Sequence, residues 1–135
     1  MHLTDEEFKI VRNILRIYVP EYDVWAFGSR ATGKRLKKFS DLDIAIITDE
    51  PLPGARLMQI KDAFSLSLLP FRTDVLDWAA TSKNFQSIIK QNYEVIQVRP
   101  DWWEKTFGKI SKIESEELLP GLHARMLHTA NNTII

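Results

Sequence analysis

The segment that most restricts the fold is the short apolar run LDIAIIT at residues 42–48. Its length, its β-branched residues and the turn-rich sequence DEPLPG that follows it are typical of a buried β-strand. Side chains alternate between the two faces of a strand, so its leucine and alternate isoleucines are expected in the core, while Asp41 and Asp43 share the opposite face. The chain is therefore expected to fold around a sheet that carries two neighbouring carboxylates.

The segments on either side alternate between helical and strand-like patterns. A capping box of Thr4 and Glu7 starts a helix that Pro20 ends. The remaining expected elements are, in order, a strand at 23–27, a short helix beginning near Arg30, a helix with Leu57, Ile60, Phe64 and Leu68, a strand at 71–79, a helix capped by Thr81 or Ser82, and a weak strand at 93–98. This order predicts an α/β (α+β) domain with a single sheet covered by helices.

The length and composition set the domain organisation. The chain has 135 residues, of which 44% are hydrophobic, and this is enough for one core of ordinary size. We expect one domain at residues 1–99 and a C-terminal appendage at residues 100–135. The appendage carries Trp102, Trp103 and Phe107, which pack on the domain's own helices in one reading and contact a partner in the other.

The charge and the cysteine content exclude several classes of protein. The 18 basic residues balance the 18 acidic residues, so no overall field attracts the chain to nucleic acid or to a membrane surface. The absence of cysteine excludes disulfides and thiolate metal sites. The first residues lack the pattern of a secretory signal, and no run approaches the roughly 20 apolar residues of a membrane span. A cytoplasmic protein is the default expectation.

The two aspartates before and within the strand indicate metal and phosphate chemistry. Carboxylates held close together repel each other unless a cation lies between them, and hard oxygen ligands favour Mg²⁺. The preceding Gly28-Ser29 turn, with a helix that begins near Arg30, is typical of a phosphate cradle. Each motif alone is a weak signal, and a basic run such as Lys34, Arg35, Lys37 and Lys38 is more often a solvated loop. The combination carries the prediction.

This combination resembles a known family. Gly28-Ser29, eleven further residues and then Asp41-Leu42-Asp43 are similar to the signature of the DNA polymerase β-like nucleotidyltransferases. The fuller sequences GSRATG and SDLDIAII are similar to the minimal nucleotidyltransferase (MNT) branch, over about residues 5–98. The resemblance implies a nucleotidyltransferase fold with a small mixed sheet flanked by helices.

The resemblance also implies the site. It places a third carboxylate on a neighbouring strand, and Asp74 matches that position. Asp77 is the rival, but three positions further along a strand it should face the other way, and a structural role is preferred for it. Two Mg²⁺ ions would be held by Asp41, Asp43 and Asp74, and ATP would be held at its phosphates by Gly28, Ser29 and Arg30.

The function that the resemblance implies is that of an antitoxin. Minimal members of this family resemble the antitoxin halves of toxin-antitoxin pairs, which silence a HEPN-type ribonuclease by transferring AMP from ATP to a tyrosine. The neutral charge agrees with a protein acceptor, with nucleic acid involved only through the partner. Two alternatives are a binding module that neutralises its partner by contact alone and a transferase that acts on an RNA end or a small molecule. An oligomer is compatible with every reading.

Overall fold

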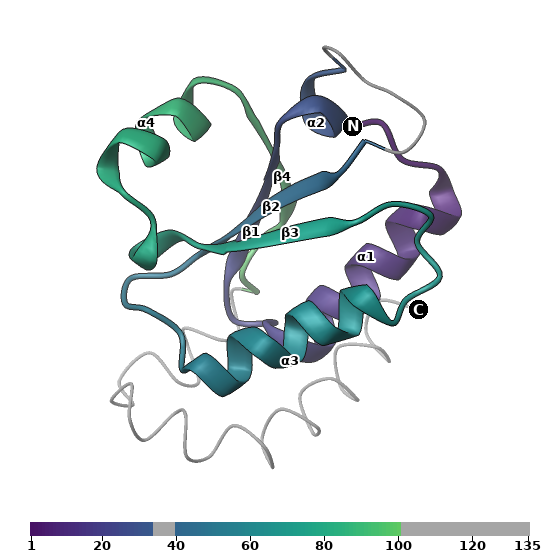
Figure 1. The fold of residues 1–135 in the computed structure, drawn as a ribbon, viewed down its shortest axis with the longest axis horizontal. Helices are drawn as coiled ribbons and strands as arrows, with labels where there is room; N and C mark the ends of the chain where they lie inside the picture. The colour runs from purple at the N-terminus through teal and green to yellow at the C-terminus, as the bar shows by residue number, and fades with distance from the viewer. Residues whose placement is uncertain (34–39, 101–135) are drawn as a thin grey trace. The chain divides into compact units, whose positions relative to one another are not determined.

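A four-stranded mixed sheet organises residues 1–33 and 40–100, which are those that the structure, a computed structural model, describes (Figure 1). Contacts between residues divide the chain after Val98 into the unit Met1–Val98 and the remainder, Arg99–Ile135. Outside the described residues lie the basic run Lys34, Arg35, Lys37 and Lys38 and the aromatic residues Trp102, Trp103 and Phe107.

The helices and strands follow the order expected from the sequence. They are α1 (Asp5–Tyr18), β1 (Asp23–Phe27), α2 (Ser29–Thr32), β2 (Leu42–Ile47), α3 (Gly54–Ser65), β3 (Thr73–Asp77), the 3₁₀ turn η1 (Trp78–Ala80), α4 (Lys83–Gln91) and β4 (Tyr93–Gln97). The capping box at the start of α1 is present, with Thr4 and Glu7 each accepting a hydrogen bond from the other's backbone amide. Local capping and turn signals therefore set most of the element boundaries.

The strand order in the sheet is β3-β2-β1-β4. Strand β1 is antiparallel to both β2 and β4, whereas β2 and β3 are parallel and are connected through helix α3. In the register of the sheet, Phe27 lies opposite Asp43 on one side and opposite Tyr93 on the other, and Asp43 lies beside Asp74. These four residues form one row across all four strands.

The two faces of the sheet are covered differently. Helices α1 and α3 contact each other and cover one face, while α4 lies on the other side (Figure 1). The core lies between the sheet and the α1–α3 layer, and its fully buried side chains are Val11, Leu15, Val19, Val24, Ala26, Leu42, Ile44, Ile46 and Ile60. Because alternate residues of β2 fill this core, Asp43 is directed to the opposite face.

Three details differ from the sequence prediction. Helix α3 ends at Ser65, and Leu68 lies beyond it with 91% of its surface exposed, because helical spacing alone does not show where the chain turns. The third strand ends at Asp77, where the chain turns into η1 rather than continuing to residue 79. Ser82, and not Thr81, caps α4, with its hydroxyl accepting a hydrogen bond from the amide of Phe85.

No helix within the described residues is long and apolar enough to cross a membrane.

Candidate active site

The carboxylates expected to form the site lie together on the sheet face opposite α1 and α3. Asp43 and Asp74 are neighbours in the parallel register of β2 and β3, so both side chains project from the same face. Asp41 precedes β2 by one residue and lies two positions from Asp43. Residues from two separate parts of the chain are thus assembled into one acidic group at the beginning of two strands.

The electrostatics of this group centre on Asp43. Burial has the largest effect, and together with the neighbouring carboxylates of Asp74 and Asp41 it raises the pKa of the Asp43 carboxyl group to about 6. The cationic side chain of Arg72 opposes this effect without cancelling it. A partly buried carboxyl group beside two others is poorly stabilised as an anion, so a cation bound there would lower the free energy of the charged form.

Arg72 supplies a protein cation to the acidic group. Its guanidinium donates from Nε (3.0 Å) and Nη2 (2.7 Å) to Oδ1 of Asp74, and its Nε lies 3.9 Å from Oδ2 of Asp41. The two carboxylates raise the pKa of the guanidinium. No motif in the sequence singles out Arg72, although its position two residues before Asp74 would place both side chains on one face of a strand.

The Gly28 turn lies directly against Asp43. Gly28 has a φ of +75°, and a Cβ atom added at this position would lie 2.5 Å from Oδ2 of Asp43. Helix α2 begins at the next residue, Ser29, and the carbonyl of Gly28 accepts hydrogen bonds from the amides of Ala31 and Thr32. Glycine is therefore required twice, for its backbone conformation and for the space beside the carboxylate.

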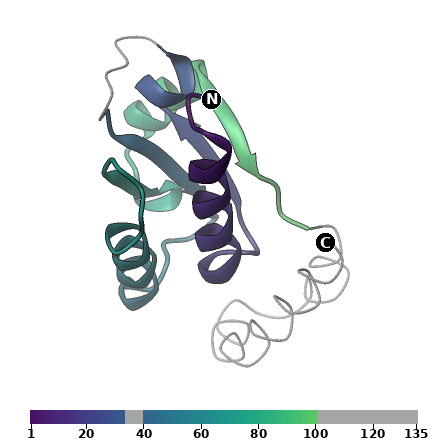
Figure 2. The same ribbon diagram turned by 90° about the vertical axis from the view of Figure 1, so that its right-hand side faces the viewer.

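Arg30 is placed differently from the other predicted phosphate ligands. Its side chain is buried, and its guanidinium donates hydrogen bonds to the carbonyls of Ser40 (2.8 Å) and His2 (3.0 Å) and stacks 3.9 Å from the ring centre of Phe71. The N-terminal segment lies next to α2, with the amide of His2 donating to the carbonyl of Arg30 (Figure 2). These contacts connect α2 to the segment that precedes the first aspartate of the site.

Asp77 has the surroundings of a structural carboxylate. It is buried, and it accepts hydrogen bonds from the hydroxyl of Thr48 and from the amide of Leu52 (2.6 Å). Its side chain lies on the core side of the sheet, as the three-residue spacing from Asp74 predicts. The carboxylate thus ties the end of β2 and the turn before α3 to the end of β3.

The donor chemistry of the acidic group suits Mg²⁺, and a protein cation already lies among its donors. The available donors are the hard carboxylate oxygens of Asp41, Asp43 and Asp74, and the cation of Arg72 already occupies a position among them. Within residues 1–33 and 40–100, no three His, Cys, Asp or Glu side chains converge tightly enough to hold a metal. A cation bound there would share the carboxylates of Asp74 and Asp41 with the guanidinium of Arg72.

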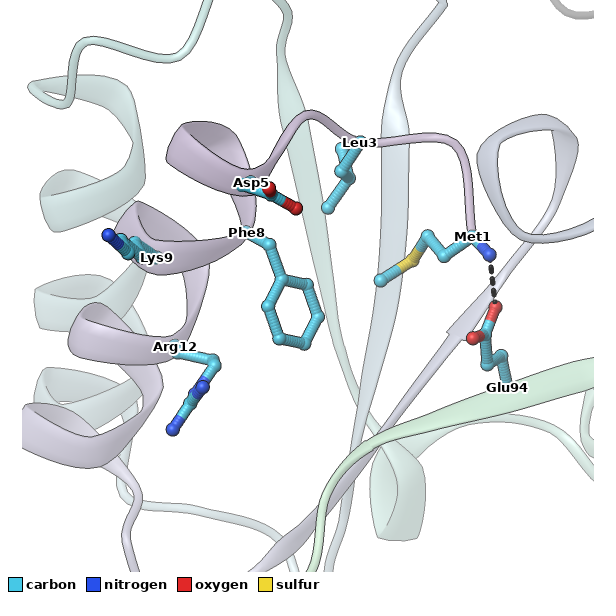
Figure 3. Close-up of a pocket in the computed structure, with 7 residues that line it drawn as sticks. All are labelled: Met1, Leu3, Asp5, Phe8, Lys9, Arg12 and Glu94. Carbon is cyan, nitrogen blue, oxygen red and sulfur yellow. Dashed lines mark ion pairs between the residues drawn. The ribbon is translucent and has the colours of Figure 1, made fainter. Parts of the chain in front are cut away.

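A pocket of about 440 Å³ lies on a different part of the molecule. It is located between α1, the N-terminal segment and β4, and Phe8 points into it from α1 (Figure 3). The amino group of Met1 pairs there with Glu94 at 2.9 Å. Glu94 follows Tyr93 on β4 and so faces the α1 side of the sheet. The pocket is separate from the carboxylate row.

Comparisons with known proteins agree with the fold and with the sequence motifs. A family model described as a nucleotidyltransferase domain matches residues 8–119. The chain is 51% identical over 109 residues to the probable protein adenylyltransferase MntA of Haemophilus influenzae. The match covers 81% of this chain and 91% of that protein. The family match extends farther along the chain than the resemblance at about residues 5–98.

Solved structures show the same fold at low sequence identity. A toxin-antitoxin complex with AMP-PNP contains a chain with a TM-score of 0.57 and 16% identity, covering 95% of this chain and 98% of that one. A structure of a tri-AMPylated HEPN toxin of Shewanella oneidensis in complex with an MNT antitoxin contains a chain with a TM-score of 0.51 and 15% identity. This match covers 95% of this chain and 96% of that one.

The mixed sheet and the motifs on it define a nucleotidyltransferase fold, as the sequence predicts. The chain belongs to the nucleotidyltransferase domain family, and within it is similar to the adenylyltransferase MntA.

Proposed function

We propose that this protein transfers AMP from ATP to a hydroxyl group of a partner protein in an Mg²⁺-dependent reaction. The observation that carries the proposal is the register of β2 and β3, which brings Asp43 beside Asp74 on the face of the Gly28 turn. Three carboxylates next to a glycine turn supply the parts that transfer of a nucleotide requires, namely ligands for cations and room for phosphate groups.

The three carboxylates have different proposed roles, which follow from their positions. Asp41 and Asp43 would hold the cations that neutralise the triphosphate, and Asp74 would hold a cation on the side of the attacking hydroxyl. When bound, two Mg²⁺ ions supply charge neutralisation for the leaving pyrophosphate and lower the pKa of the attacking hydroxyl. Asp74 is also the candidate acceptor of the hydroxyl proton, either directly or through a water molecule.

The Gly28 turn would hold the phosphates. Without a Cβ at position 28, the turn lies directly against the carboxylate of Asp43, which brings its backbone close to the cations that would carry the phosphates, and Ser29 adds a hydroxyl donor. The hydrogen bonds of Arg30 to the carbonyls of His2 and Ser40 favour a positioning role for it, in which it fixes α2 relative to the aspartates rather than contacting phosphate.

The reaction is a substitution at the α-phosphorus. The hydroxyl oxygen of the acceptor forms a bond to that phosphorus, the bond from the phosphorus to the bridging oxygen breaks, and pyrophosphate leaves with the electron pair. The proton of the hydroxyl passes to Asp74 or to solvent. The product is a phosphodiester between AMP and the acceptor.

The comparisons support a HEPN-type toxin as the acceptor protein. The 51% identical relative is named as a protein adenylyltransferase, and one structural neighbour is an MNT antitoxin in complex with an AMPylated HEPN toxin. We therefore propose that this chain acts as the antitoxin of such a pair and modifies a tyrosine of its partner. ATP is the proposed substrate, and Mg²⁺ is the proposed cofactor.

Transfer with ATP labelled at different phosphates tests the proposal. The purified protein, Mg²⁺ and a HEPN-type partner are incubated with ATP labelled at either the α- or the γ-phosphorus. We expect only the α label on the partner, and none when Asp43→Asn replaces the wild type. Transfer of the γ label would show phosphoryl transfer instead, and transfer of neither label would remove the enzymatic reading.

A further inference from the structure

The row that holds the acidic residues continues across the sheet as aromatic residues. Phe27 on β1 lies opposite Asp43, and Tyr93 on β4 lies opposite Phe27, so both rings project from the same face as Asp43 and Asp74. Neighbouring strands are about 4.8 Å apart, which places Tyr93 about 10 Å from Asp43 along the row. Phe27 also directly precedes Gly28, the residue beside the carboxylate.

Helix α4 brings a further aromatic side chain to this face. Phe85 meets Phe27 edge-to-face, with ring centres 6.0 Å apart and an interplanar angle of 77°. Tyr93 stacks on Trp25, with ring centres 4.0 Å apart and an angle of 15°. Phe85 and Tyr93 nevertheless keep 42% and 40% of their surfaces exposed. The rings are held in place by aromatic neighbours and still present surface to solvent.

We propose that Phe27, Phe85 and Tyr93 form a stacking platform for the purine base of the bound nucleoside triphosphate. The inference rests on the proposed function, which places the nucleophile at Asp74, the pyrophosphate at the Gly28 turn and the α-phosphorus between them. An in-line substitution keeps these groups on one axis, so the nucleoside must branch away from it. The aromatic residues are the apolar surface that the register places next to that axis.

The chemistry of the platform sets its selectivity. Its residues offer a base the faces and edges of three rings and one phenolic hydroxyl, and stacking on aromatic side chains tolerates any base. A larger base covers more ring surface. The platform therefore favours purine over pyrimidine triphosphates by area.

Binding of two probes to the full chain separates this platform from the phosphate site. The first probe is α,β-methylene-ATP, which cannot undergo the transfer, and the second is inorganic tripolyphosphate, which has no base. Isothermal titration calorimetry in Mg²⁺ gives both affinities. We expect Phe85→Ala and Tyr93→Ala each to weaken the nucleotide analogue about tenfold while tripolyphosphate changes less than twofold.

The matched controls lie on the same elements. Ile88→Ala removes an equally apolar side chain from α4, where 62% of it is exposed, and should leave both affinities unchanged. Tyr93→Phe keeps the ring and should retain most of the affinity. Circular dichroism establishes that each variant is folded. Phe85→Ala gives an independent test if loss of the Trp25 stack unfolds the Tyr93 variant.

The outcomes distinguish failure of the platform from failure of the proposed function. Asp43→Asn should weaken both probes, because the carboxylate serves the phosphate end of either one. If Asp43→Asn weakens both and the double variant Phe85→Ala, Tyr93→Ala binds the analogue as tightly as the wild type, the platform is overturned and the phosphate site stands. If Asp43→Asn changes neither probe, the proposed function fails at its own site. Weaker partner binding with unchanged nucleotide affinity in the double variant would make these rings a protein interface and overturn the platform.

Discussion

The two ends of β3 place carboxylates in opposite situations. Asp77 is buried and accepts hydrogen bonds from the hydroxyl of Thr48 and the amide of Leu52, so its negative charge is matched by protein donors. At the other end, Asp74 pairs with the exposed guanidinium of Arg72, and the neighbouring carboxyl group of Asp43 on β2 is partly buried beside Asp74 and Asp41, which raise its pKa. The carboxylate of Asp77 is held by buried donors, whereas the acidic group at the other end is crowded with like charges that Arg72 offsets only in part.

This contrast separates structural from functional acids by their partners rather than by their burial. A carboxylate that holds elements together is surrounded by hydrogen-bond donors, and its removal leaves those donors unpaired. A carboxylate suited to hold a cation lies among like charges, as Asp43 does, and the missing Cβ of Gly28 lets that carboxylate lie directly against the turn. Substitutions at the two ends should accordingly change different properties.

The largest effect is expected for Asp43→Asn on catalysis. If Asp43 holds the cations as proposed, its loss should lower the rate of AMP transfer by at least about a thousandfold, or about 4 kcal/mol in the activation free energy. The thermal midpoint of the metal-free protein should not fall, because one of three mutually repelling charges is removed. A single-turnover assay and differential scanning calorimetry measure the two properties. Retained transfer would place the catalytic metal elsewhere.

Asp77→Asn should give the reverse pattern. The asparagine amide cannot accept both hydrogen bonds that the carboxylate receives, so the free energy of unfolding should fall by about 2 kcal/mol. The folded fraction should bind ATP with unchanged affinity. Asp62→Asn, at an exposed position of α3, is the control and should leave stability unchanged. A loss of nucleotide affinity without a loss of stability would move Asp77 into the site.

Gly28→Ala tests the space between the turn and the carboxylate. Its Cβ would meet Oδ2 of Asp43 and would require an unfavourable positive φ, so we expect ATP affinity to fall at least about tenfold and stability to fall by about 1 kcal/mol. Gly54→Ala is the matched control, because no atom lies within 4 Å of its added Cβ. Equal effects of the two substitutions on ATP affinity would show that the turn has no special role.

The smallest expected effect is a dependence of stability on pH. Asp43 has a pKa of about 6 in the folded chain against an ordinary value of 3.8, so the native state binds more protons than the unfolded state between these values. Its contribution to the free energy of unfolding therefore falls as pH rises from about 4 to about 6. Screening by solvent limits this loss to about 1 kcal/mol for a partly exposed group.

Urea denaturation of the metal-free wild type and Asp43→Asn at pH 4, 5, 6 and 7 measures this difference. The variant should gain in relative stability as pH rises through this window. Parallel pH profiles would contradict the raised pKa.

Much of the fold could be predicted from the sequence, because its signals are local. The capping box of Thr4 and Glu7 marks the start of α1, and Gly28 marks the end of β1. The structure reproduces both boundaries. The end of α3 could not be placed in the same way. Leu68 continues the helical spacing and yet lies outside the helix, because the chain tightens into a turn after Ser65, where the amide of Ser67 donates to the carbonyl of Phe64.

The candidate site was less accessible to sequence reasoning, because its contacts join distant segments. The motif around Asp41 and Asp43 is local, whereas the pairing of Asp43 with Asp74 depends on the parallel register of two strands joined through a helix. Arg30 has the sequence context of a phosphate ligand, and only its contacts with the His2 carbonyl and the Phe71 ring show a buried connecting role. Local patterns predict candidate residues, and the register decides which of them meet.

The mass of the partner protein tests the central claim most directly. A HEPN-type toxin is produced together with wild-type protein or with Asp43→Asn, and each complex is isolated and analysed by intact mass spectrometry. The account predicts that the toxin from the wild-type complex is heavier by one or more AMP groups, and that the toxin bound to Asp43→Asn has its unmodified mass. A toxin that is neutralised by the wild type without any gain in mass would contradict the account and identify a protein that acts by contact alone.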